Sequence, residues 1–181
     1  MRNRVLPLLL LVAGSCSTAV LAPPKPTYFY YLHGKIVEDL GPRGLSSGLT
    51  VVSEVRPKDT DPSAYADRLV ADIRARLRAG VAPSRITVAG SSKGSVIASL
   101  VSTRLNVPGV RYVLIANCND RLLREIKPRL TGDILSIYEA SDDIGQSCAP
   151  VIAASPAAGR FEEVRLTTGL GHGVVYRPLS V

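Results

Sequence analysis

Residues 90–94 of the chain read Gly-Ser-Ser-Lys-Gly, a Gly-x-Ser-x-Gly pattern with Ser92 at its centre. An apolar run over 86–89 precedes the pattern, and a helix-like apolar stretch follows it. A strand that reverses sharply into a helix exposes its central serine, and the flanking glycines let the neighbouring backbone pass without side-chain clashes. Ser92 is therefore the candidate nucleophile, with Gly90 and Gly94 as the glycines of the turn. The bare pattern also arises by chance, so partner residues must support it.

A serine hydroxyl attacks an acyl carbon only when a base removes its proton, and histidine is the usual base. The chain has two histidines. His172 lies in a glycine-flanked loop beyond the last predicted strand, whereas His33 directly follows the first predicted strand and is interpreted as a structural residue of that loop. Asp142, near the end of the preceding strand, is the candidate acid that orients His172. The adjacent Asp143 is the alternative acid.

The elements that must position these residues alternate along the chain. Asp61 is the expected N-cap of a helix that starts at Pro62 and ends at Gly80, and a second helix follows Ser92 and stops before Pro108. Strands apolar on both faces, alternating with amphipathic helices, indicate a parallel sheet covered on both sides, hence a three-layer α/β/α sandwich. The predicted strands cover residues 28–32, 49–55, 86–89, 112–116, 134–138 and 164–167.

Ligands of open parallel sheets bind beyond the carboxyl ends of the strands. Ser92, Asp142 and His172 each follow a predicted strand, in that order along the chain. This order resembles that of the α/β-hydrolase superfamily, and the resemblance extends from about Tyr28 to Arg177. It implies a single reduced α/β-hydrolase domain over residues 23–181, without the two leading strands and without a cap domain over the site.

The same resemblance implies an oxyanion hole and a two-step reaction. His33-Gly34 is similar to the His-Gly motif that precedes the first oxyanion-hole residue, which corresponds to Lys35. The second donor would be the backbone N–H of Lys93. Ser92 would form an acyl-enzyme and His172 would move the proton, after which water would release the acid.

The expected activity is hydrolysis of a small-molecule carboxylic ester, with amides and thioesters less favoured. The connection over 34–48 is short for a crossover between parallel strands and is broken by glycine and proline, so a working oxyanion hole is not assured. The alternative is therefore a noncatalytic binding protein on a degenerate α/β-hydrolase scaffold.

The N-terminus has the pattern of a signal peptide over residues 1–22. Basic residues at positions 2 and 4 precede a short apolar run over 5–13, which predicts export to the periplasm or beyond. Two cleavage patterns fit: an ordinary site ending at Ala19 or Ala22, and a lipobox that would leave a lipid anchor on Cys16. No other stretch has the length and hydropathy of a membrane span.

The remaining cysteines, Cys118 and Cys148, form a predicted disulfide in an oxidising compartment, and the bridge would hold the loop of Asp142. Two buried free thiols are the alternative. The net charge of +7 arises mostly from arginines on predicted helix faces without interleaved aromatic residues, which argues against nucleic-acid binding. No residues have the spacing of zinc ligands, so no metal is predicted. The P-loop spacing is also absent, which argues against nucleotide binding, and no cofactor is expected.

Overall fold

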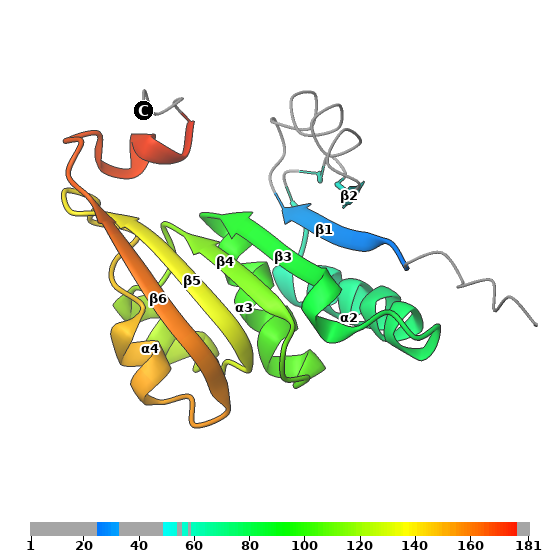
Figure 1. Ribbon diagram of the computed structural model, residues 1–181. Coiled ribbons are helices and arrows are strands. Elements are labelled where there is room, and N and C mark those ends of the chain that lie inside the picture. Colours follow the sequence, from blue (N-terminus) through cyan, green and yellow to red (C-terminus); the bar gives the residue numbers. More distant parts are fainter. Residues whose placement is uncertain (1–24, 33–48, 54–55, 58, 177–181) are drawn as a thin grey trace, which may run out of the picture.

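A computed structural model describes residues 25–32, 49–53, 56–57 and 59–176 of the chain. Its centre is a six-stranded sheet with the strand order β2-β1-β3-β4-β5-β6 (Figure 1). Every neighbouring pair of strands is parallel, which confirms the predicted α/β class. The strands are β1 (Thr27–Leu32), β2 (Leu49–Val52), β3 (Ile86–Ser91), β4 (Arg111–Ile115), β5 (Gly132–Glu139) and β6 (Ala158–Leu166).

The helices follow the expected local signals. Helix α2 (Pro62–Arg78) begins after Asp61, whose Oδ1 accepts a hydrogen bond of 2.7 Å from the N–H of Ala64. Gly80 adopts a φ of +82° just beyond its end. The remaining helices are α3 (Lys93–Leu105), α4 (Ala149–Ala153), the π-helix η2 (Leu122–Ile126) and the 3₁₀ turns η1 (Pro83–Arg85) and η3 (Gly171–Tyr176).

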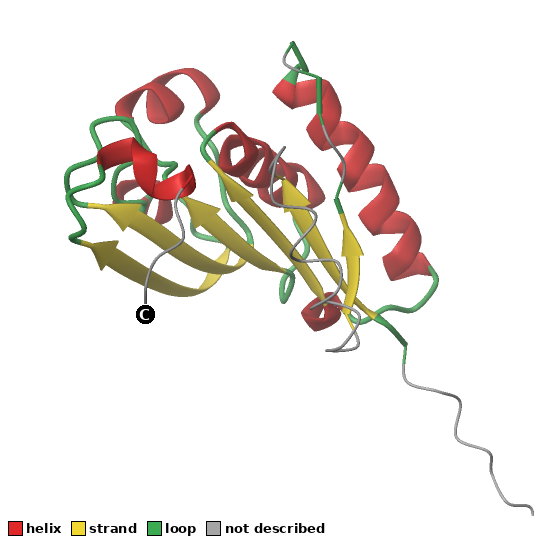
Figure 2. Ribbon diagram, turned by 90° about the horizontal axis from the view of Figure 1, so that it is seen from above, coloured by secondary structure: helices red, strands yellow, loops and turns green. Residues whose placement is uncertain are grey.

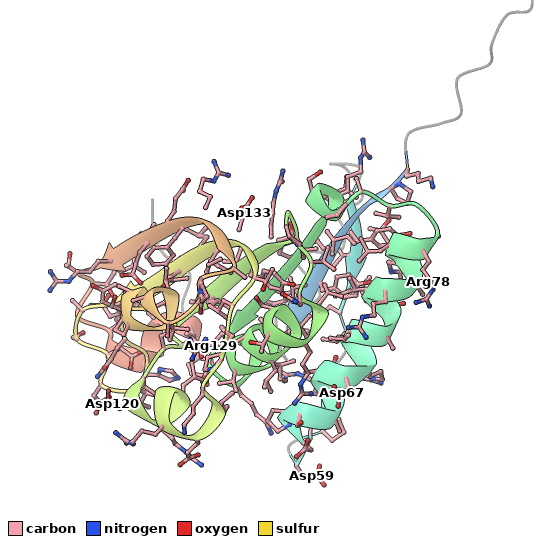
Figure 3. The ribbon with its side chains drawn as sticks, turned by 90° about the horizontal axis from the view of Figure 1, so that it is seen from below. Asp59, Asp67, Arg78, Asp120, Arg129 and Asp133 are labelled. Carbon is pink, nitrogen blue, oxygen red and sulfur yellow. A yellow bond between two sulfur atoms is a disulfide. The ribbon has the colours of Figure 1, made fainter. Side chains whose placement is uncertain are left out.

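Helices α2, α3 and α4 lie on the same face of the sheet, as the views in Figures 1 and 2 agree. Arg104 of α3 donates a hydrogen bond of 2.8 Å to Asp67 of α2, which Figure 3 labels, and so joins the two long helices. These helices supply one of the two expected helical layers. The connection 33–48 lies outside the described residues.

The main core lies between the sheet and these helices. Ile86 and Leu114 of the sheet and Ile73 and Ile97 of the helices are completely buried. In the middle of β5, Ile134 and Ser136 on the helical face are buried, whereas Leu135 on the opposite face is half-buried. Side chains of successive strand residues point to opposite faces, so this alternation shows which face meets the helices.

Strand β6 is longer than predicted. It begins at Ala158, whereas the sequence prediction began at residue 164. Arg160, Glu162 and Glu163 interrupt the apolar pattern in the missed part. Strand β6 pairs only with β5, and edge strands tolerate charged side chains that a central strand would exclude.

The predicted signal peptide over 1–22 and its candidate anchor Cys16 lie outside the described residues. Within the described parts of the chain, no helix has both the length and the apolar character needed to cross a membrane.

Candidate active site

Ser92 occupies the turn between β3 and α3 in a strained backbone conformation. Its φ of 49° and ψ of −121° lie in a region that residues with a side chain rarely adopt. The N–H of Ser92 donates a hydrogen bond of 2.9 Å to the carbonyl oxygen of Ile115 at the end of β4. The neighbouring strand therefore helps to hold the turn in this conformation.

Gly90 and Gly94 are needed where they stand because the backbone is crowded on both sides of Ser92. A Cβ atom on Gly90 would lie 2.3 Å from the carbonyl oxygen of Gly94. A Cβ atom on Gly94 would lie 1.9 Å from the carbonyl oxygen of Leu32 in β1. Real Cβ atoms do not approach backbone so closely, so the tight strand-to-helix turn requires glycine at both positions.

Ser92, His172 and Asp142 form a continuous hydrogen-bonded chain. His172 Nε2 lies 2.9 Å from Ser92 Oγ, and His172 Nδ1 lies 2.8 Å from Asp142 Oδ2. An ionised carboxylate only accepts hydrogen bonds, so Nδ1 carries the ring proton and donates it to Asp142 in a hydrogen bond. Nε2 then has a free lone pair and accepts a hydrogen bond from the Ser92 hydroxyl. Figure 1 shows the red turn η3, which carries His172, beyond the ends of β5 and β6.

Of the two adjacent aspartates, the structure brings Asp142 to His172. The side chain of Asp142 is fully buried, and its Oδ1 accepts a hydrogen bond of 2.8 Å from the N–H of Ile144. Burial alone would raise the pKa of Asp142, but hydrogen bonds from His172 and from backbone N–H groups lower it. Asp143 is exposed. Asp142 therefore stays ionised while it faces the imidazole.

The loop that carries Asp142 is anchored to the segment after β4 at two points. Cys118 and Cys148 form a disulfide, which confirms the predicted pairing. Asn119 Nδ2 also donates a hydrogen bond of 2.7 Å to the carbonyl oxygen of Ile144. Both contacts lie within six residues of Asp142, so they restrict the movement of the loop that carries it.

Sequence analysis missed Glu139, the last residue of β5. Its side chain is 1% exposed, and its Oε2 accepts hydrogen bonds from the N–H and the hydroxyl of Thr168 at 2.9 and 2.8 Å. Its Oε1 accepts hydrogen bonds from Gly169 N–H at 3.2 Å and from Ser141 Oγ at 3.1 Å. Burial would raise its pKa, but these donors lower the pKa of Glu139 to about 2. A carboxylate directly after the largely apolar run 134–138 is the signal that could have revealed it.

One of the two predicted oxyanion donors can be placed. Lys93 is the first residue of α3, at the positive end of the helix dipole. Its N–H directly follows Ser92 in the chain. The other candidate, Lys35, and the preceding His33 lie outside the described residues. In the part of the chain that the structure describes, no three His, Cys, Asp or Glu side chains group as a metal site would require.

No protein-family model matches the sequence, and no curated protein matches it. Solved structures do resemble it. SOBER1 from Arabidopsis thaliana superposes with a TM-score of 0.58 at 13% identity, over 82% of this chain and 91% of that one. MGS-M1, an α/β hydrolase enzyme from a Medee basin deep-sea metagenome library, has a TM-score of 0.58 at 17% identity, over 80% of this chain and 69% of that one.

A third similar structure, esterase PE8, has a TM-score of 0.50 at 17% identity, over 83% of this chain and 86% of that one. Together with the parallel sheet and the strained serine turn after β3, these similarities show that the chain has the α/β-hydrolase fold. The expected fold is thereby confirmed.

Proposed function

We propose that this chain is a serine hydrolase that cleaves carboxylic esters through Ser92, His172 and Asp142. The observation that carries the proposal is the hydrogen-bonded chain from Ser92 Oγ through both ring nitrogens of His172 to Asp142 Oδ2. A serine beside a neutral imidazole, which is itself held by a buried carboxylate, is the arrangement that activates a hydroxyl as a nucleophile. Two of the similar structures are described as hydrolases or esterases, which supports the same class.

The reaction follows from these positions. Ser92 Oγ attacks the ester carbonyl carbon while His172 Nε2 takes the hydroxyl proton, and Asp142 stabilises the resulting imidazolium. The carbonyl oxygen becomes an oxyanion, to which the N–H of Lys93 donates a hydrogen bond. His172 then protonates the leaving alcohol as the C–O bond breaks, which leaves an acyl group on Ser92. Water, deprotonated by His172, attacks this acyl-enzyme and releases the acid.

A fluorophosphonate probe tests the nucleophile directly, because it labels only an activated serine. We expect the folded protein to be labelled and Ser92→Ala to remain unlabelled. Ser91→Ala is the matched control, since it removes the adjacent hydroxyl and should leave labelling intact. The noncatalytic binding protein considered above predicts no labelling of the wild type. That result, or equal labelling of wild type and Ser92→Ala, would overturn the proposal.

We further propose that the protein is exported. The support is the signal-peptide pattern over 1–22 together with the disulfide between Cys118 and Cys148, because such bonds persist in oxidising compartments. N-terminal sequencing and intact mass of protein from an expressing bacterium test this. A mature chain starting near residue 20 or 23 indicates an ordinary signal peptide, and one starting at a lipid-modified Cys16 indicates an anchor. An intact Met1 in all of the protein would contradict export.

A further inference from the structure

The carboxylate of Glu139 joins the segments that carry the acid and the base. Ser141, one residue before Asp142, donates to Glu139 Oε1, as does Gly169, three residues before His172. The two segments also contact each other, because the N–H of Gly171 donates to Ser141 Oγ at 3.1 Å. Both segments are therefore held by hydrogen bonds to the same buried side chain, that of Glu139.

Strand β5, which ends at Glu139, is a rigid support for such an anchor. It pairs with β4 on one side and with β6 on the other. By contrast, His172 lies in an irregular loop and a 3₁₀ turn, and Asp142 lies in a turn after the strand. Loop residues need additional contacts to hold a reactive geometry, and small displacements of reacting groups reduce rates strongly.

We propose that Glu139 is a positioning residue that sets the placement of His172 relative to Asp142 and Ser92. This inference rests on the proposed hydrolase function. Glu139 does not itself touch the reacting atoms. Its four hydrogen bonds at 3.2 Å or less join the end of β5 to residues 141, 168 and 169, and so fix the path of the chain on both sides of the Asp142–His172 contact.

Glu139→Gln tests the proposal, because it keeps the shape of the side chain but presents an NH₂ group to hydrogen-bond donors. We expect kcat for a p-nitrophenyl ester to fall about 10- to 100-fold with little change in KM. Thr131→Val is the control for stability alone: it removes a buried hydroxyl that donates a hydrogen bond of 2.8 Å to Asn106 Oδ1, just before the start of β5 and so at the opposite edge of the sheet from the site, and should leave kcat unchanged. Thr168→Val, which removes one donor, serves as the second variant if Glu139→Gln does not fold.

A double-mutant cycle distinguishes positioning from general stabilisation. If Glu139 acts through the acid and base, Glu139→Gln should lower kcat much less in an Asp142→Asn background than in the wild type. An unchanged kcat in both Glu139→Gln and Thr168→Val, or fully additive effects with Asp142→Asn, would overturn the proposal. Failure of the wild type to label with fluorophosphonate would instead contradict the proposed function.

A cavity beside the serine turn supports a second inference, which also rests on the proposed hydrolase function. It has a volume of about 290 Å³, between the first turn of α3 and the π-helix η2. Lys93, which directly follows Ser92, lines it, and so does Asn119, which holds the acid's loop. The rest of its lining consists of the apolar side chains Pro62, Val96, Leu122 and Ile126 and of Arg121 and Glu125, which form an ion pair with each other at 2.9 Å.

The position of His172 indicates which part of an ester this cavity receives. His172 Nε2 must reach the oxygen of the leaving alcohol, so the alcohol lies on the side of η3. No described residue from 140–148 or from 166–176 lines the cavity. We propose that the cavity binds the acyl group, and that the preferred substrates are esters of short, apolar carboxylic acids.

A series of p-nitrophenyl esters, from acetate to octanoate, tests the acyl subsite because the alcohol stays constant. We expect kcat/KM to rise about two- to fourfold for each added methylene that the cavity buries. Val96→Phe should abolish this rise, and Val96→Ala should extend the rise to longer chains. Val164→Phe is the control, because Val164 is exposed on β6 and is 43% accessible.

Two outcomes distinguish failure of the acyl subsite from failure of the proposed function. A series without chain-length dependence, or a dependence that both Val96 variants leave intact, would overturn the acyl subsite. Absence of both labelling and hydrolysis in the wild type would contradict the proposed function and not the cavity's role alone.

Discussion

Gly94 lies so close to Leu32 that a Cβ atom at position 94 would be 1.9 Å from the Leu32 carbonyl oxygen. The first turn of α3 therefore packs directly on the end of β1. This contact places Ser92 beyond the carboxyl end of the sheet, where His172 reaches it.

Gly94→Ala is expected to destabilise the protein by about 1–3 kcal/mol, because the added methyl group must displace backbone and not a flexible side chain. Urea denaturation measures the loss. Gly173→Ala is the matched control, since a Cβ atom there meets nothing within 4 Å, and its effect should stay within about 0.5 kcal/mol. Equal stability losses in the two variants would contradict the close packing of α3 on β1.

The two adjacent aspartates provide a direct test of the acid. Asp142→Asn should lower kcat about 10³- to 10⁴-fold, because an amide at this position favours the wrong tautomer of His172. Asp143→Asn changes the same type of side chain one residue further on, at an exposed position, and should leave kcat within about twofold. Steady-state hydrolysis of a p-nitrophenyl ester measures both. A larger loss in Asp143→Asn would assign the acid to Asp143.

The disulfide should contribute to stability through the loop that it closes. Its cysteines are separated by 30 positions, so replacing both Cys118 and Cys148 with alanine is expected to cost roughly 3 to 4 kcal/mol. Alanine is preferable to serine because both sites are buried, and a serine hydroxyl there would lose its hydrogen bonds to water. Urea denaturation with and without reductant measures the effect. Reductant should lower the stability of the wild type and leave the double variant unchanged.

Glu139 should make stability depend on pH in acid. Its pKa is lowered from the ordinary value of 4.5 to about 2 in the folded protein. The folded state therefore binds fewer protons than the unfolded chain between these values, and the stability that Glu139 contributes above pH 4.5 is lost as the pH falls towards 2. Urea midpoints at pH 6, 4 and 3 should fall less steeply in Glu139→Gln than in the wild type. Parallel slopes would contradict the lowered pKa.

Local patterns predicted the elements around the serine turn well. The N-cap at Asp61 and the Gly-x-Ser-x-Gly turn depend on neighbours within a few residues, so they can be recognised without tertiary structure. The apolar pattern missed the first part of β6, which begins at Ala158 and not at residue 164. An edge strand pairs on one side only, so it can carry charged residues such as Arg160 and Glu162 along its length.

The sequence by itself determined the order Ser92, Asp142, His172 along the chain, and it predicted a disulfide between Cys118 and Cys148 with two free thiols as the alternative. Only the tertiary structure decided between Asp142 and Asp143, because the direction of each side chain depends on a turn and on a partner 30 residues away. It also revealed Glu139, whose role comes from contacts with Thr168 and Gly169 on the segment that follows the neighbouring strand. Such contacts join groups distant in sequence, and no local pattern encodes them.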